Sequence, residues 1–125
     1  AACKELGGCK TGEAKVTSGF NLPARLVIHT VGPVWRNGTA NESALLRACY
    51  RNVYAYVDEH EIKTIAFPSI STGAYCFPLE QAIPIALSET CAALRMNKNI
   101  QEIYFVCFDQ HTFSQYHSAY ANLTC

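Results

Sequence analysis

The residues best suited to chemistry lie in one short stretch, Ser-Ile-Ser-Thr-Gly-Ala-Tyr-Cys-Phe, which ends at Phe77. Ser71 and Thr72 carry hydroxyl donors, and Gly73 allows the backbone to approach a phosphate closely or to adopt a positive φ. Tyr75 and Phe77 are aromatic and can form the wall of a pocket. We interpret the stretch as a phosphate-binding loop, although an ordinary strand-to-helix connection with a tight turn at Gly73 fits the same spacing.

The segments on either side of this loop explain why it is well placed for binding. Residues 62–67 are apolar and rich in β-branched side chains, as is typical of a strand buried on both faces of a sheet. Pro78 favours the first turn of a helix. Ligands of α/β sheets bind beyond the carboxyl ends of the strands, where a helix N-terminus offers unpaired N–H groups. We therefore expect the loop to lie at a ligand-binding edge.

A second strand is expected to end at the same edge. Residues 102–108 form the last apolar run, followed by Asp109, a favourable N-cap for a final helix. Phe108 at this strand end is placed to stack against a base. The final helix should turn an apolar face inward, carrying Phe113, Tyr116, Tyr120 and Leu123.

The expected order is helix tail, two strands, and then helices alternating with strands in the second half of the chain. Residues 13–18 and 25–31 are expected to form antiparallel strands, and residues 1–6 the tail of a helix. Within the second strand, His29 is either a catalytic base or, more often for a lone histidine, a hydrogen-bonded core residue. The order predicts one domain, residues 1–125, with a three-layer α/β/α fold around a central mixed sheet.

Two helices are expected to pack on this sheet. The first runs to about Glu59 and begins at Thr39-Ala-Asn-Glu42, which has the pattern of a capping box. The second covers residues 79–96. Pro84 within it should kink the first turns or shift the start of the helix toward itself.

Composition limits the class of function. Ten basic and ten acidic residues cancel without a run of like charge, which argues against a nucleic-acid partner. The seven cysteines mostly lie in apolar segments and are interpreted as buried thiols of a reducing compartment. Their spacing fits no zinc site, and no apolar run reaches membrane length. A cytoplasmic protein without a metal or cofactor is expected.

Several motifs together resemble the macrodomain family, most closely its MacroD-like bacterial branch. They are Gly7-Gly-Cys-x-Thr-Gly-Glu-Ala14, Phe20-Asn-Leu-Pro-Ala24, Val27-Ile-His-Thr-Val-Gly-Pro33, Cys49-Tyr-Arg-Asn52, Ile65-Ala-Phe-Pro-x-Ile-Ser-Thr-Gly73 and Val106-Cys-Phe-Asp109. The family binds ADP-ribose and related metabolites. Many of its members hydrolyse mono-ADP-ribose from acidic side chains or deacetylate O-acetyl-ADP-ribose.

The resemblance implies roles for individual residues. It places the diphosphate on the backbone amides of the second phosphate-binding loop and the distal ribose beside Phe77. It places adenine against Phe108, and Asp109 next to it is also expected among the ligand-binding residues. That loop consists of Ser71, Thr72, Gly73, Ala74 and Tyr75. Cys76 stands where relatives usually have glycine, and Pro84 where they have a helix former.

The resemblance also implies an absence. The adenine-reading Gly-Asp turn, the Asn-Ala-Ala-Asn strand end and the first phosphate loop of the family do not occur in this sequence. We therefore expect no catalytic residue in this chain, and strand edges left unpaired where an interior strand is missing. Three hypotheses follow: a macrodomain completed by an N-terminal segment, a non-catalytic ADP-ribose reader, or a structural remnant that associates through its exposed edge.

Overall fold

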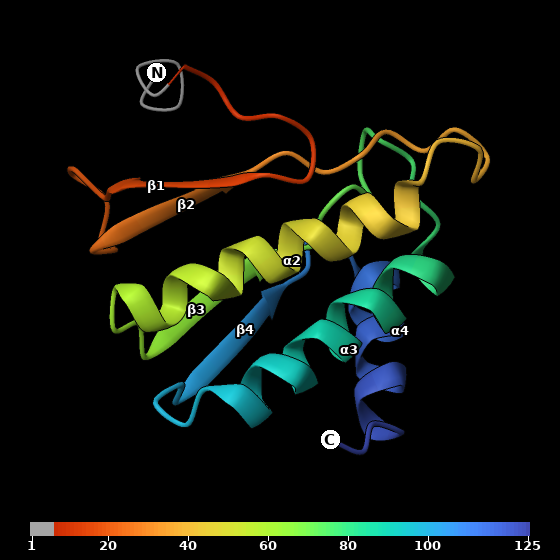
Figure 1. Cartoon of the computed structure of the whole chain (residues 1–125). Coiled ribbons are helices and arrows are strands. Elements are labelled where there is room, and N and C mark those ends of the chain that lie inside the picture. The colour runs from red at the N-terminus through yellow and green to blue at the C-terminus, as the bar shows by residue number, and fades with distance from the viewer. Residues whose placement is uncertain (1–6) are drawn as a thin grey trace.

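The computed structural model describes residues 7–125, which contain four strands and three helices (Figure 1). The expected helix tail, residues 1–6, lies outside the described residues. The strands are β1 (Ala14–Ser18), β2 (Leu26–Thr30), β3 (Thr64–Pro68) and β4 (Glu102–Val106). The helices are α2 (Glu42–Glu59), α3 (Leu79–Met96) and α4 (Gln110–Ala121). The predicted α/β class and the order of these elements are confirmed.

The strands form two separate pairs. β1 and β2 are antiparallel, as predicted, and Val16 lies opposite Ile28. β3 and β4 are parallel, with Phe67 opposite Phe105. Both modes of pairing expected of a mixed sheet are present, but β2 and β3 share no ladder, so the described strands form two two-stranded sheets. The arrowheads of β2, β3 and β4 point the same way in Figure 1.

The core lies on one face of the β3–β4 pair. Phe67 is 4% exposed and its ring packs against Tyr50 and Tyr54 of α2 and against Phe105 of β4. Tyr116 of α4 stacks on Phe105 in turn. Buried residues of α3 complete the same cluster. All three helices thus cover one face, and alternate residues of β3 and β4 are exposed on the other, so only one helical layer of the predicted three-layer arrangement lies within residues 7–125.

Two predictions about helix starts are wrong. α2 has Asn41 as its N-cap, with φ 57 and no side-chain cap, so Thr39 and Glu42 do not form a capping box. Glu42 instead binds backbone N–H groups of the preceding loop. α3 begins at Leu79 and continues through Pro84, so the start is not shifted to the proline. The helix tolerates the one hydrogen bond that the proline removes because Ile83 and Ile85 beside it are buried in the core, and a kink at Pro84 stays a prediction.

The prediction for α4 is correct at its start and partly wrong for its face. Asp109 is the N-cap, and its side chain accepts a hydrogen bond from the Thr112 N–H at 2.7 Å. Tyr116 is buried, but Phe113 and Tyr120 are 52% and 69% exposed. Tyr116 stacks on Phe105 of β4, and Leu123, just after α4, packs partly buried against the core as expected.

The cysteine prediction also needs correction. Cys91 of α3 and Cys125 form a disulfide that closes a segment of 34 residues. Cys49 is a buried thiol as expected, whereas Cys76 is exposed. In this structure the cysteines are therefore not uniformly buried thiols. In the described part of the chain, no helix is long and apolar enough to cross a membrane.

Candidate functional site

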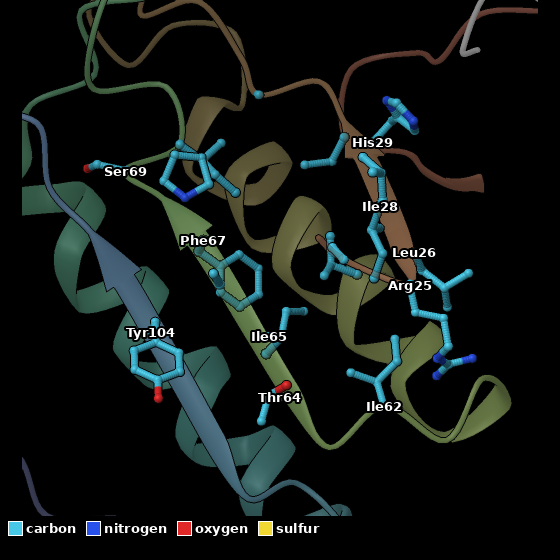
Figure 2. A pocket seen from close by; sticks show the side chains of 18 of the residues that line it. Arg25, Leu26, Ile28, His29, Ile62, Thr64, Ile65, Phe67, Ser69 and Tyr104 are labelled. Atoms are coloured by element: carbon cyan, nitrogen blue, oxygen red, sulfur yellow. The ribbon is translucent and has the colours of Figure 1, made fainter. Parts of the chain in front are cut away.

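A cleft of about 1070 Å³ runs between β2 and β3 (Figure 2). It exists because β2 pairs only with β1, and β3 only with β4, so two strand edges border the same space. Leu26 and Ile28 of β2 lie across it from Ile65 of β3, and Val53 of α2 also lines it. Its walls are mainly apolar, which suits an extended or ring-bearing ligand more than a hydrated ion.

His29 does not act as a free base in this cleft. Its Nε2 lies 2.8 Å from the Thr17 hydroxyl, in a cross-strand hydrogen bond between β2 and β1. In Figure 2 its ring points away from β3. His29 is hydrogen-bonded as predicted, but it is half-buried and lies outside the core cluster.

One end of the cleft is formed by residues 69–77, which we name the anion loop. Ser71 lines the cleft with a left-handed backbone, φ 65, and its carbonyl oxygen accepts a 2.9 Å hydrogen bond from the Phe77 N–H. The Ser71 hydroxyl is buried and has no hydrogen-bond partner among the described residues. A buried hydroxyl without a partner loses the hydrogen bonds it had in water. It is therefore an unsatisfied hydrogen-bonding group, buried at the loop end of the cleft.

The middle of the anion loop presents its backbone outward. The N–H groups of Gly73, Ala74 and Tyr75 donate no hydrogen bond to any residue within 7–125. The Thr72 hydroxyl, by contrast, is engaged inside the loop with Ser69, at 3.0 Å from its carbonyl oxygen and 2.6 Å from its Oγ. Successive unpaired N–H groups in a turn form an anion-binding surface. The prediction that the backbone rather than basic side chains would hold an anion is consistent with this geometry.

The positive φ values expected at Gly73 occur elsewhere in the loop. Ser71 and Cys76 adopt left-handed conformations, with φ 65 and 61, and Gly73 does not. A Cβ added at Gly73 would meet nothing within 4 Å. Gly73 therefore contributes open space above the backbone. The backbone at Cys76 is left-handed, a conformation that glycine adopts most easily. This explains why relatives usually have glycine where this chain has Cys76.

The two aromatic residues of the loop differ in position. Tyr75 is 40% exposed and lines the cleft. Phe77 is only 2% exposed and packs against Trp35, with ring centroids 4.9 Å apart. Trp35 also donates its backbone N–H to the Tyr75 carbonyl oxygen at 2.8 Å. Phe77 is thus a core residue in this structure, and its role beside a ligand stays a prediction.

The end of β4 reaches the same edge as the anion loop, as predicted. Parallel pairing places Pro68 opposite Val106, so the residues after both strands emerge together. Phe108 is 92% exposed, which leaves its ring free for stacking. The hydrogen bonds from the Thr112 backbone and side chain hold the pKa of the Asp109 carboxyl below its ordinary value, so Asp109 is an anion committed to capping α4.

Sequence reasoning missed the residues that support the anion loop from β2. A Cβ at Gly32 would overlap Ser71 Oγ and lie 2.7 Å from Ile70 Cγ2, so only glycine fits beside the loop. No role was predicted for Trp35 from the sequence. The sequence did offer a signal for its role. Trp35 is the single tryptophan of the chain, and it comes shortly after the strand end at Gly32-Pro33. In residues 7–125, no group of three His, Cys, Asp or Glu side chains is arranged to hold a metal ion.

The fold and this edge define a class of protein: an α/β domain with a backbone anion loop at the carboxyl ends of parallel strands. The Macro domain family model matches residues 1–86. A macro domain-containing protein of Chlorobaculum tepidum is 51% identical over 120 residues, covering 96% of this chain and 70% of the relative. The chain belongs to the Macro domain family.

Other relatives and structures agree with this assignment. The protein named O-acetyl-ADP-ribose deacetylase 1 of Pantoea vagans is 46% identical over 88% of this chain and 64% of its own length. A variant of the Oceanobacillus iheyensis macrodomain with ADPR superposes with a TM-score of 0.87 and 38% identity, covering 96% of this chain and 68% of that one. The Trypanosoma brucei macrodomain in complex with ADP-ribose superposes with a TM-score of 0.86 and 36% sequence identity. The match covers 95% of this chain and 50% of that one. The chain thus spans between half and about seven tenths of the proteins named here.

Proposed function

We propose that this chain, as a single macrodomain unit of residues 1–125, binds ADP-ribose or an ADP-ribosylated protein at the anion loop. The observation that carries the proposal is the set of three consecutive N–H groups, Gly73 to Tyr75, which have no partner within residues 7–125 and lie beside the buried Ser71 hydroxyl. A diphosphate offers acceptors for these three backbone donors. Relatives solved with ADPR and ADP-ribose support the choice of ligand.

The neighbouring residues suit the other parts of such a ligand. Phe108, exposed at the end of β4, offers an aromatic face for the adenine ring. Tyr75 lines the cleft beside the loop and provides a wall for a ribose. Asp109 completes the strand end by fixing the start of α4. In this arrangement the loop supplies affinity through backbone donors, and the two aromatic residues supply orientation.

We further propose that the complete protein hydrolyses mono-ADP-ribose esters or O-acetyl-ADP-ribose. The name of the Pantoea vagans relative supports this proposal. In this reaction the residues of this chain position the substrate. The loop holds the diphosphate, so that the distal ribose meets a water molecule at a fixed place. This is a proximity and electrostatic effect. We assign no catalytic residue within this sequence, since the asparagine and aspartate motifs of the family are not in it.

A complementing segment would supply both the missing motifs and a strand. The cleft between β2 and β3 supports this, because two strand edges that run in the same direction border it. An added strand would pair with both edges and pack over Val53 of α2. The reader hypothesis requires no such segment, and the remnant hypothesis leaves the edge for association. A cytoplasmic location, without a nucleic-acid partner, remains part of the proposal.

Calorimetric titration of ADP-ribose into the 125-residue chain tests the binding proposal, with AMP and ribose 5-phosphate as controls. Saturable one-to-one heat for ADP-ribose, with little for the controls, is the expected result if the loop binds the diphosphate unaided. Absence of heat from a folded sample would show that these residues alone do not form the site.

A second titration separates reader from hydrolase. The part of the Chlorobaculum tepidum relative outside its matched 120 residues is added as a separate polypeptide, and release of ADP-ribose from a modified glutamate peptide is followed. We expect release only in the mixture. Release by the 125 residues alone would contradict the assignment of catalysis to a complementing segment, and binding without release in the mixture would favour the reader.

A further inference from the structure

Glu42 is a buried carboxylate with an unusual set of partners. It is 1% exposed, and it takes part in no ion pair among residues 7–125. The ion pairs there join Glu89 to Arg47 and Arg51. Its Oε2 accepts hydrogen bonds from the N–H groups of Arg36 and Gly38, both at 2.8 Å, and its Oε1 accepts one from Ala40. One buried charge is therefore satisfied by the backbone of a single short segment.

That segment, residues 33–41, contains three residues in left-handed conformations. Asn37, Gly38 and Asn41 have φ of 58, 80 and 57. Glycine and asparagine enter the left-handed region more readily than other residues, so the sequence permits this backbone, and hydrogen bonds from neighbouring side chains hold it in place. The Thr39 hydroxyl adds one bond, to the Arg36 carbonyl oxygen at 2.6 Å. Glu42 supplies three more, all to the backbone.

The same segment carries Trp35 to the anion loop. Trp35 donates its N–H to the Tyr75 carbonyl oxygen, and its ring packs on Phe77 at 4.9 Å. A Cβ at Gly38 would lie 3.6 Å from the far edge of the Trp35 ring, so the ring also lies against the segment that Glu42 holds. A continuous set of contacts thus joins the buried carboxylate to the loop that follows β3.

We propose that Glu42 is a positioning residue for ligand binding: by fixing residues 33–41, it sets the position of Trp35 and, through Trp35, the conformation of the anion loop. The inference rests on the proposed function, because it assigns an affinity to that loop. Burial pushes the pKa of the Glu42 carboxyl upward, but the hydrogen bonds from Arg36, Ala40 and Gly38 outweigh it and leave that pKa below the ordinary value. The carboxylate is therefore charged at neutral pH.

The variant Glu42→Gln tests the proposal. Its amide keeps the shape of the side chain but turns one acceptor into a donor that faces backbone N–H groups. Glu89→Gln is the matched control, since Glu89 is also a buried carboxylate, 6% exposed, but joins α2 to α3 through Arg47 and Arg51. Trp35 is the only tryptophan, so its fluorescence reports on residues 33–41 without labelling.

Two readouts are compared at a temperature where all variants are folded by circular dichroism. For Glu42→Gln we expect Trp35 emission to shift to the red with greater acrylamide quenching, and ADP-ribose affinity to fall roughly 2- to 30-fold, the range for remote coupled residues. Glu89→Gln should lower the melting temperature without moving either readout. If Glu42→Gln does not fold, Glu42→Asp, which keeps the charge but shortens its reach, is measured in its place.

The outcomes separate this inference from the proposed function. Unchanged emission and affinity in Glu42→Gln, equal changes in both variants, or altered emission with unaltered affinity would each overturn the positioning role. If the wild-type chain fails to bind ADP-ribose, the proposed function fails for these residues, and the emission comparison still decides whether Glu42 positions Trp35 against the loop.

Discussion

The backbone N–H of Trp35 donates a 2.8 Å hydrogen bond to the carbonyl oxygen of Tyr75. This bond crosses between the segment after β2 and the loop after β3, although those two strands share no ladder. The packing of Trp35 on Phe77 reinforces it. The anion loop is thus held from its own strand and from the neighbouring pair, which restricts the directions in which its free N–H groups can point.

Gly73→Glu should abolish ADP-ribose binding. The new side chain and its negative charge would occupy the place of the diphosphate, where electrostatic repulsion adds to the steric conflict. Because a Cβ at Gly73 meets nothing within 4 Å, the fold should tolerate the change. Calorimetry measures the loss, and Gly73→Ala, which adds a Cβ without a charge, separates the steric part of the effect from the electrostatic part. Retained affinity in Gly73→Glu would remove the anion loop from the site.

Phe108→Ala should weaken ADP-ribose binding by about 1–3 kcal/mol, the range for loss of an aromatic ring stacked on a base. The ring is 92% exposed, so the free energy of unfolding should hardly change. Phe20→Ala is the control, since Phe20 is 74% exposed but lies between β1 and β2. Equal affinity of the two variants would show that Phe108 does not contact the ligand.

The regular elements were predictable because their signals are local. The bounds of α3 and the end of α2 at Glu59 follow from apolar residues at helical spacing, and Asp109 carries its own capping geometry. Glu42 shows where this fails. Thr-Ala-Asn-Glu matches a capping box, yet the carboxylate binds a loop that folds back over it, a choice made by contacts that the local pattern does not contain.

The candidate site was predictable in its location but not in its construction. Strand ends and a polar turn placed Ser71 and Phe108 at one edge, and parallel pairing accounts for this. The side on which Phe77 is buried depends on Trp35, which is far away in the sequence. The pairing of Cys91 with Cys125 was equally hidden, since seven cysteines allow many pairings and sequence alone selects none.

Gly32→Ala should destabilise the chain by about 1–3 kcal/mol, as expected when extra volume is forced into a packed site. The added methyl group would overlap the Ser71 hydroxyl and push against Ile70, so the anion loop must move. Urea unfolding measures the stability, and calorimetry the accompanying loss of ADP-ribose affinity. Gly73→Ala, which meets open space, is the control. A Gly32→Ala variant as stable as wild type would show that the loop yields without cost.

Cys125→Ser should lower the free energy of unfolding by about 3–4 kcal/mol under oxidising conditions, from the chain entropy of a closed loop of this size. The bond to Cys91 closes 34 residues that include β4 and α4. Adding a reductant should bring wild type down to the stability of the variant. Cys76→Ser, at an exposed free cysteine, should change little. A wild type that is indifferent to reductant would mean that the bond contributes no stability.

Tyr54→Phe should change the pH dependence of stability in a defined direction. The Tyr54 hydroxyl lies 2.7 Å from that of Thr90. Burial raises the pKa of Tyr54 to about 12, against the opposing effect of this hydrogen bond. Because the folded pKa lies above the ordinary value of 10.0, its contribution to stability is complete below pH 10 and is lost as the pH rises through about 12.

The variant lacks both the hydrogen bond and the titration. Near neutral pH it should be about 1 kcal/mol less stable than wild type, the usual net value of such a bond, since the Thr90 hydroxyl keeps its bond to the Ala86 carbonyl oxygen. Between pH 10 and 12 the wild type should lose stability relative to the variant, so that the two curves converge and cross. Urea unfolding at a series of pH values measures the difference, and a constant gap would show that Tyr54 ionises in the folded chain as freely as in the unfolded one.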